Sequence, residues 1–180
     1  SMKSLKVADY EAIAKLDGVK AASPMTNGSY VVIYQNKNWT TSVSGVSYNY
    51  LDVNNWSMKS GRFLSEKNVQ NRERVAVVGK TVVKNLFGDE DPVGAEIRVK
   101  NIPFRIIGVL NSKGSGAMGN DQDDMVIIPY TTAMERVEGV DYLRMIYVVG
   151  KDENGIDRLQ SDIENLLRVR HGIKDTNLDD

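Results

Sequence analysis

The chain has 180 residues, of which 41% are hydrophobic and 26% are charged, and its formal net charge is −1. These values are typical of a globular protein of one or two domains, and the intermixing of basic and acidic residues argues against a nucleic-acid-binding surface. The chain has no cysteine, which excludes disulfides, cysteine-based metal sites and a thiol nucleophile.

The first third of the chain is predicted to form a helix followed by antiparallel strands. Residues 6–16 place apolar side chains on one helical face, and a glycine follows at position 18. Short apolar runs predict strands over residues 19–25, 29–34 and 39–46. Hairpin turns are predicted at Asn27-Gly28 and at residues 35–38. One or two helical turns over residues 48–56 and a connector over residues 60–64 are expected to follow.

The middle of the chain is predicted to form a strand, a short helix, a tight turn and two paired strands. The run Val75-Ala76-Val77-Val78 has the length of a buried strand. Residues 81–87 have helical spacing, and Gly88 stands where a helix often ends. Pro92-Val93-Gly94 indicates a turn, and residues 96–100 and 104–110 alternate as strands do.

The last third of the chain begins with a predicted loop over residues 111–124, which are rich in Gly, Ser and Asp. A strand (125–128), a helix (131–137) and a second strand (142–149) are expected next. Asp152 can cap a final helix whose apolar stripe contains Ile156, Leu159, Ile163, Leu166 and Leu167. Residues 173–180 are mostly polar and are predicted to be a frayed tail.

A resemblance to a known family is carried by the middle of the chain. The segment VAVVGKTVVKNLFGDEDPVGAEIRVKNIPFRIIGVL (residues 75–110) is followed by Lys113-Gly114, by residues 121–124 and by Ile128-Pro129-Tyr130-Thr131-Thr132. This pattern resembles the extracytoplasmic domain of MacB-like ABC transporter permeases, and its most specific parts are LFG-x-x-DPVG, IIGVL and IPYTT. Weaker matches at residues 13–24, 43–46 and 60–62 extend the resemblance over most of the chain.

The resemblance implies an α+β fold with two subdomains. A porter-like α/β subdomain would combine the two chain ends, residues 1–46 and 141–172. A small α/β subdomain of the Sabre-like type, residues 47–140, would be inserted between them. The predicted elements agree with this arrangement, because the helix and strand at the start are matched by a strand and helix at the end.

The same resemblance implies a non-catalytic domain on the extracytoplasmic side of the inner membrane, which is periplasmic where the envelope has an outer membrane. The domain would transmit ATP-driven motion across the membrane, a mode called mechanotransmission, to export or release cargo. The implied partners are a membrane-fusion adaptor protein, the ATPase domain or subunit of the same transporter, and a second permease copy. No apolar run reaches the ~20 residues that cross a bilayer. Ser1-Met2 is expected to be a cloning remnant, so the chain is expected to be a piece of a longer parent. The resemblance implies that transmembrane segments flank the domain in that parent.

Two alternative functions remain open at this point. One is the outer domain of a related permease in lipoprotein release or cell-wall regulation, and the other is a free-standing ligand-binding module, which a deep apolar pocket would favour. A hydrolase finds little support, because His171 is the only histidine and no Gly-x-Ser-x-Gly elbow accompanies it.

No cofactor or metal site is predicted. Gly79-Lys80-Thr81 resembles the end of a phosphate-binding loop, but Arg74 stands where that motif needs its first glycine. Asp121, Asp123 and Asp124 lack the spacing of an EF-hand and are interpreted as a solvated acidic loop.

Four residues are predicted to contact a partner protein. Asn36 lies at the expected tip of a hairpin, whereas Lys113, Met118 and Asp121 lie in the loop over residues 112–124. Met118 is an apolar side chain in a polar, glycine-rich segment where no core is expected, which favours an exposed contact.

Overall fold

The computed structural model describes residues 5–116 and 119–172 of the chain. The strands are β1 (Val19–Tyr34), β2 (Lys37–Val46), β3 (Met58–Gly61), β4 (Val75–Val78), β5 (Glu96–Val99), β6 (Ile102–Leu110), β7 (Met125–Pro129) and β8 (Met145–Gly150). The helices are α1 (Val7–Ala14), α2 (Tyr50–Asn54), α3 (Glu66–Gln70), α4 (Lys80–Leu86), α5 (Tyr130–Thr132), the π-helix η1 (Ala133–Glu138), the 3₁₀-helix η2 (Glu153–Gly155) and α6 (Ile156–Arg170). The mixed content confirms the predicted α+β class.

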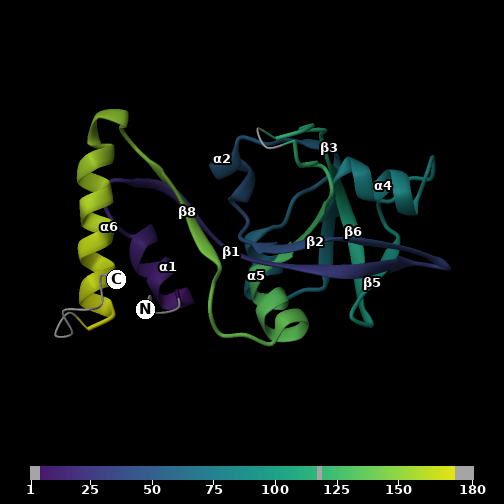
Figure 1. The fold of residues 1–180 in the computed structure, drawn as a ribbon, viewed down its shortest axis with the longest axis horizontal. Helices are drawn as coiled ribbons and strands as arrows, with labels where there is room; N and C mark the ends of the chain where they lie inside the picture. The colour runs from purple at the N-terminus through teal and green to yellow at the C-terminus, as the bar shows by residue number, and fades with distance from the viewer. Residues whose placement is uncertain (1–4, 117–118, 173–180) are drawn as a thin grey trace.

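Six strands close on themselves in the order β1-β2-β7-β4-β6-β5, and β5 returns to β1. Closure depends on the C-terminal half of β1, which pairs with β2 along one edge and with Val99 and Arg98 of β5 along the other. The pairs β2–β7 and β4–β6 are parallel, and the others in the ring are antiparallel. The result is a small barrel, which lies to the right in Figure 1.

The largest core fills this barrel with inward-facing side chains from all six strands. Phe104, Ile97 and Val126 have no exposed surface. Helix α4 adds Val82 and Leu86 to the same core, and η1 adds Val137. A second core lies outside β4, β6 and β7, where α2 and β3 cover it; its buried members are Met25, Val46, Tyr50, Leu64, Val75, Val77, Ile107, Leu110, Met125 and Ile127.

The two chain ends form a separate part of the molecule, called here the terminal part. The N-terminal half of β1 extends beyond the barrel and pairs with β8, from Val19–Gly150 to Met25–Met145. Helices α1 and α6 pack on this ribbon around the buried side chains of Ile13, Val19, Ala22 and Leu159. This confirms that the helix and strand at the start pack with the strand and helix at the end.

Two local predictions were wrong. Asn27 and Gly28 do not turn but stay inside β1, because each pairs with β2 in register and Asn27 Nδ2 donates to Ser42 Oγ and Ser44 Oγ (2.9 Å each). The turn predicted at residues 35–38 is confirmed and lies at Gln35–Asn36, where Gln35 takes φ of 53°. The connector expected at residues 60–64 is wrong at its start, because residues 60 and 61 belong to strand β3 on the edge of β6.

The last strand and helix also differ in detail. Ile146 and Val148 of β8 face the terminal core, whereas Met145 is 39% exposed. On α6, the stripe from Leu159 to Leu167 packs as predicted, but Ile156 is 45% exposed and lies outside it.

The predicted subdomain limits, 1–46 with 141–172 and 47–140, remain a prediction. Strand pairing crosses the proposed limit at residue 46, because β2 is paired with β7 from Ser42 to Val46. Within the described ranges, no helix is both long and apolar enough to span a membrane.

Candidate functional site

Asp9, in the first turn of α1, is the point where the two ends of the described chain meet. Its carboxylate is 2% exposed and accepts hydrogen bonds from Arg170 Nε (2.7 Å) and from the Lys6 backbone N–H (2.8 Å). His171 Nε2 lies 3.0 Å from Asp9 Oδ2, the oxygen that also accepts from the Lys6 N–H. Figure 1 shows the start of α1 and the end of α6 near each other, at the lower left.

The electrostatics of Asp9 explain why a carboxylate is stable in this position. Burial alone would raise its pKa, but the hydrogen bonds from Arg170, Lys6 and His171 outweigh burial and lower the pKa below its ordinary value. His171 follows the last turn of α6 and contacts this buried carboxylate there.

The loop between β6 and β7 is organised by Asp123. This side chain is 5% exposed and accepts hydrogen bonds from Lys113 N (2.6 Å), Ser112 Oγ (2.8 Å) and Gly114 N (3.1 Å). Burial would raise its pKa, but these three donors and the charge of Lys80 lower it. The interpretation of Asp123 as part of a solvated acidic loop was therefore wrong, because its carboxylate is the buried centre of the loop.

The same loop covers the start of α4. The backbone N–H of Thr81 donates to the Asp123 carbonyl (3.2 Å), and Gly79 N–H donates to the Met125 carbonyl (3.0 Å). A side chain at Gly79 would collide with the Asp123 carbonyl oxygen. Two backbone donors at the start of α4 are thus used within the protein.

Asp124 fastens the loop to the barrel. Its Oδ1 accepts hydrogen bonds from Trp39 Nε1 (2.8 Å) and Thr41 Oγ1 (2.6 Å), both on β2. Within the described ranges, no group of three or more His, Cys, Asp or Glu side chains is arranged to hold a metal ion.

The loop residues predicted to contact a partner also make internal contacts. Lys113 Nζ donates to the Asn54 carbonyl (3.0 Å) and lies 4.7 Å from the centre of the Trp56 ring. Asp121 accepts hydrogen bonds from Thr81 Oγ1 and from the Asp123 backbone N–H. Met118 lies outside the described residues. The exposed surface of the loop is therefore held in a defined shape by its own acidic side chains.

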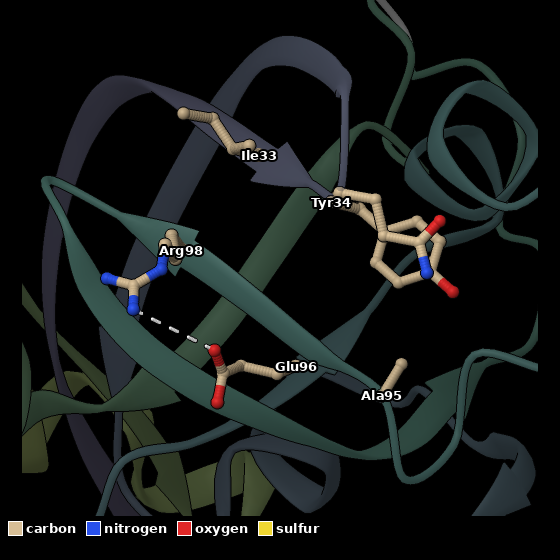
Figure 2. Close-up of a pocket in the computed structure, with 6 residues that line it drawn as sticks. Ile33, Tyr34, Ala95, Glu96 and Arg98 are labelled. Carbon is tan, nitrogen blue, oxygen red and sulfur yellow. Dashed lines mark ion pairs between the residues drawn. The ribbon is translucent and has the colours of Figure 1, made fainter.

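Asn36 occupies the two-residue turn of the β1–β2 hairpin, at the far right of Figure 1. Next to this tip is an open hollow of about 430 Å³ lined by Ile33, Tyr34, Gln35, Ala95, Glu96 and Arg98. Figure 2 shows the Arg98–Glu96 ion pair (4.0 Å) along one side and Tyr34 on the other. The Tyr34 ring packs on Phe87 at 4.1 Å, and its hydroxyl donates to Glu90 (3.0 Å).

The three predicted contact residues that the structure describes, Asn36, Lys113 and Asp121, do not form one site. The hairpin tip lies at the right end of the molecule, whereas the loop leaves β6 on the upper side (Figure 1). Asp9, Asp123 and Asp124 are the organising residues that sequence reasoning missed. The position of Asp9 in an otherwise apolar helix, and of Asp123 and Asp124 just before a strand, could have indicated a structural role. The donors to these carboxylates could not be predicted, because they come from other parts of the chain.

Comparison with known proteins gives consistent matches. The family model described as the MacB-like periplasmic core domain matches residues 1–166. The macrolide export ATP-binding/permease protein MacB of Marinobacter nauticus is 37% identical over 175 residues, which cover 97% of this chain and 27% of that protein. The protein of the same name from Rhodospirillum rubrum is 42% identical over 171 residues, with 94% and 26% covered. The chain thus spans about a quarter of the length of these relatives.

Solved structures give the same result for the fold. The periplasmic region of MacB from Actinobacillus actinomycetemcomitans superposes with a TM-score of 0.85 at 27% identity, covering 95% of this chain and 76% of that one. The extracellular domain of the ABC-type transporter YknZ from Gram-positive bacteria gives a TM-score of 0.83 at 20% identity, with 94% and 85% covered. The second likeness concerns the fold alone.

Proposed function

Since the chain belongs to the MacB-like periplasmic core domain family, and so is the periplasmic domain of a MacB-like ABC transporter permease, we propose that it transmits ATP-driven movement across the membrane to export or release cargo. In this proposal the domain performs no catalysis and binds no cofactor. ATP is hydrolysed elsewhere in the transporter, and the domain acts as a rigid moving part.

The observation that carries the proposal is the junction at Asp9. A domain inserted between two transmembrane helices must receive and return the chain on one side. Lys6 and His171, close to the two ends, contact the same carboxylate, so force applied through either end reaches the same point. Such a junction supports coupling of membrane helices to the domain as one unit.

The division into a terminal part and a barrel supports the mechanical role. The two parts are connected by β1, which belongs to both, and by the segment between η1 and β8. They also touch where the rings of Tyr10 on α1 and Tyr130 at the start of α5 pack edge to face, with centroids 6.0 Å apart. Small rotations at such contacts are the usual basis of domain movement.

We place the adaptor contact on the loop around Lys113 and Asp121 and on the hairpin tip at Asn36. In Figure 1 the hairpin tip lies at the end of the molecule opposite α6 and the loop lies at the upper edge, so neither surface is next to the Asp9 junction. The loop is already fixed by Asp123, so binding to it involves little ordering cost. The ATPase part and a second permease copy complete the proposed transporter.

The alternative role in lipoprotein release or cell-wall regulation uses the same geometry and differs only in the partner. A free-standing ligand-binding module is less well supported, because the hollow beside the hairpin tip and the one between Tyr10 and Tyr130 are both open and lined by charged as well as apolar groups.

A cross-linking experiment in the full-length parent permease tests the mechanical role. Because the domain has no cysteine, Tyr10→Cys and Tyr130→Cys introduce a unique pair here, which a reducible bifunctional maleimide can join. We expect cross-linking to stop cargo movement, reduction to restore it, and the single variants to be unaffected by the reagent. Full transport in the cross-linked protein would contradict movement between the two parts.

A labelling experiment tests the location. Asn36→Cys, at the exposed turn, should react with a membrane-impermeant maleimide in cells whose inner membrane is intact. Labelling only after the inner membrane is permeabilised would contradict an extracytoplasmic domain.

A further inference from the structure

Five arginines from separate segments line one open hollow of about 550 Å³ on the outside of the barrel. They are Arg62 after β3, Arg72 and Arg74 before β4, Arg105 on β6 and Arg136 in the π-helix η1. We call this site the arginine hollow. Val75 and Ile107, which are 8% and 7% exposed, also line it and give it an apolar surface among the arginines.

The protein balances the positive charges in the arginine hollow only in part. Arg72 forms an ion pair with Glu135 (3.4 Å), and Glu73 is the only acidic side chain in the lining. Arg62 donates to the neutral Asn68 Oδ1 (3.1 Å).

The remaining three arginines lack such partners. In the part of the chain that the structure describes, no hydrogen bond or ion pair reaches the guanidinium groups of Arg74, Arg105 and Arg136. A chain with a net charge of −1 thus concentrates like charges in one place, where they repel one another unless an anion is bound.

We propose that the arginine hollow binds the phosphate headgroup of an anionic phospholipid. Guanidinium groups bind phosphate oxygens in pairs, and several arginines converging from different segments suit the several oxygens of one phosphate. The apolar surface of Val75 and Ile107 offers contact to the carbon chain next to the phosphate, which a free phosphate ion would leave unused. The inference rests on the proposed function only for the source of the lipid, the membrane in which the chain ends are anchored.

The test uses the cysteine-free domain as it is, with three probes. The first is inorganic phosphate, the second is dihexanoyl phosphatidylglycerol below its micelle concentration, and the third is a pair of vesicles, phosphatidylcholine alone or mixed with phosphatidylglycerol. We expect the short-chain lipid to bind more tightly than inorganic phosphate. We also expect binding to the mixed vesicles but not to phosphatidylcholine vesicles, and weaker binding as salt is added.

Variants assign the binding to the arginine hollow. Arg74→Gln with Arg105→Gln should weaken binding of both lipid probes about tenfold, because it removes two charges that contact the headgroup. Lys84→Gln with Arg158→Gln removes the same charge from exposed positions on α4 and on the first turn of α6, and should leave binding unchanged.

Each other outcome overturns a defined part of the proposal. Equal binding by both double variants, or equal binding to both vesicle types, removes the arginine hollow as a lipid site. Equal affinity for inorganic phosphate and the short-chain lipid makes it a site for free anions instead. Binding of the short-chain lipid without binding of vesicles overturns docking of the hollow at a membrane surface. The headgroup is then still recognised, and the proposed function, which the Tyr10–Tyr130 cross-link tests separately, is unaffected.

Discussion

The barrel and the terminal part are stabilised in different ways. In the barrel, sixteen buried side chains form one core, and the closed ring of strands leaves no free edge in the ring itself. In the terminal part, four buried side chains form the core between α1, α6 and the β1–β8 ribbon, and the neighbouring apolar groups are only partly buried. A hydrogen-bonded carboxylate, Asp9, takes over part of the role that packing has in the barrel.

This difference shows how one chain can combine a rigid part, the barrel, with a more deformable one, the terminal part. A closed barrel with a dry core changes shape only at a large cost in packing. A two-stranded ribbon with two helices is marginal alone and depends on its neighbours. The terminal part therefore holds the chain ends together, while the barrel keeps the exposed loop and hairpin in a fixed relation.

The largest expected effect on stability comes from truncating a side chain in the barrel core. Phe104→Ala removes a fully buried ring and should lower the free energy of unfolding by about 3–5 kcal/mol. Ile163→Ala, on the partly buried stripe of α6, should cost less than half as much. Urea unfolding of both variants measures the difference, and equal losses would mean that the two parts are equally well packed.

The next effect concerns the Asp9 junction. Asp9→Asn removes the charge that Arg170 and His171 contact, and should lower the free energy of unfolding by about 1.5–3 kcal/mol. Hydrogen exchange followed by mass spectrometry should show faster exchange in α1 and α6 and unchanged exchange in the barrel.

Asp162→Asn on the exposed face of α6 is the matched control and should change little. Faster exchange throughout the barrel in the Asp9 variant would show that the two parts unfold as one unit.

A smaller effect is the dependence of stability on pH. The pKa values of Asp9 and Asp123 are both lowered in the folded chain, so their contribution is fully present above the unfolded value of about 3.9. It is lost as pH falls through the folded pKa values. We therefore expect the stability of α1, α6 and the loop to fall as the pH is lowered. In the Asp9→Asn variant, the stability of the two helices should depend less steeply on pH. An unchanged slope in that variant would contradict the assignment to Asp9.

The sequence predicted the parts of the fold that depend on local patterns. The buried strand at residues 75–78 and the two strands after Pro92-Val93-Gly94 were predicted from short-range periodicity, and the resemblance placed them in a family. Asn27-Gly28 shows the limit of local signals. This dipeptide favours a tight hairpin, but ten consecutive pairs with β2 hold it in an extended strand.

The functional surfaces were harder to predict because they combine distant residues. The donors to Asp9 come from positions 6, 170 and 171, and no pattern in the sequence connects them. The arginine hollow was missed for the same reason. Basic and acidic residues are intermixed along the chain, yet folding places five arginines together. Barrel closure was also missed, because it depends on the two edges that one long strand, β1, offers to different partners.

The smallest expected effect tests whether the surface loop shares the stiffness of the barrel below it. Lys113→Met removes a hydrogen bond to the Asn54 carbonyl and a cation–π contact with Trp56, both exposed, and should cost about 0.5–1 kcal/mol. Lys84→Met, on the exposed side of α4, controls for the loss of a lysine. Because the Lys113 backbone N–H still donates to Asp123, the loop should keep its shape, and hydrogen exchange at residues 112–114 should stay slow. Exchange as fast as in an unstructured loop would contradict this prediction. It would mean that the Lys113 side chain, rather than the buried Asp123 carboxylate, fixes the loop, and that the loop after β6 is less rigid than the barrel.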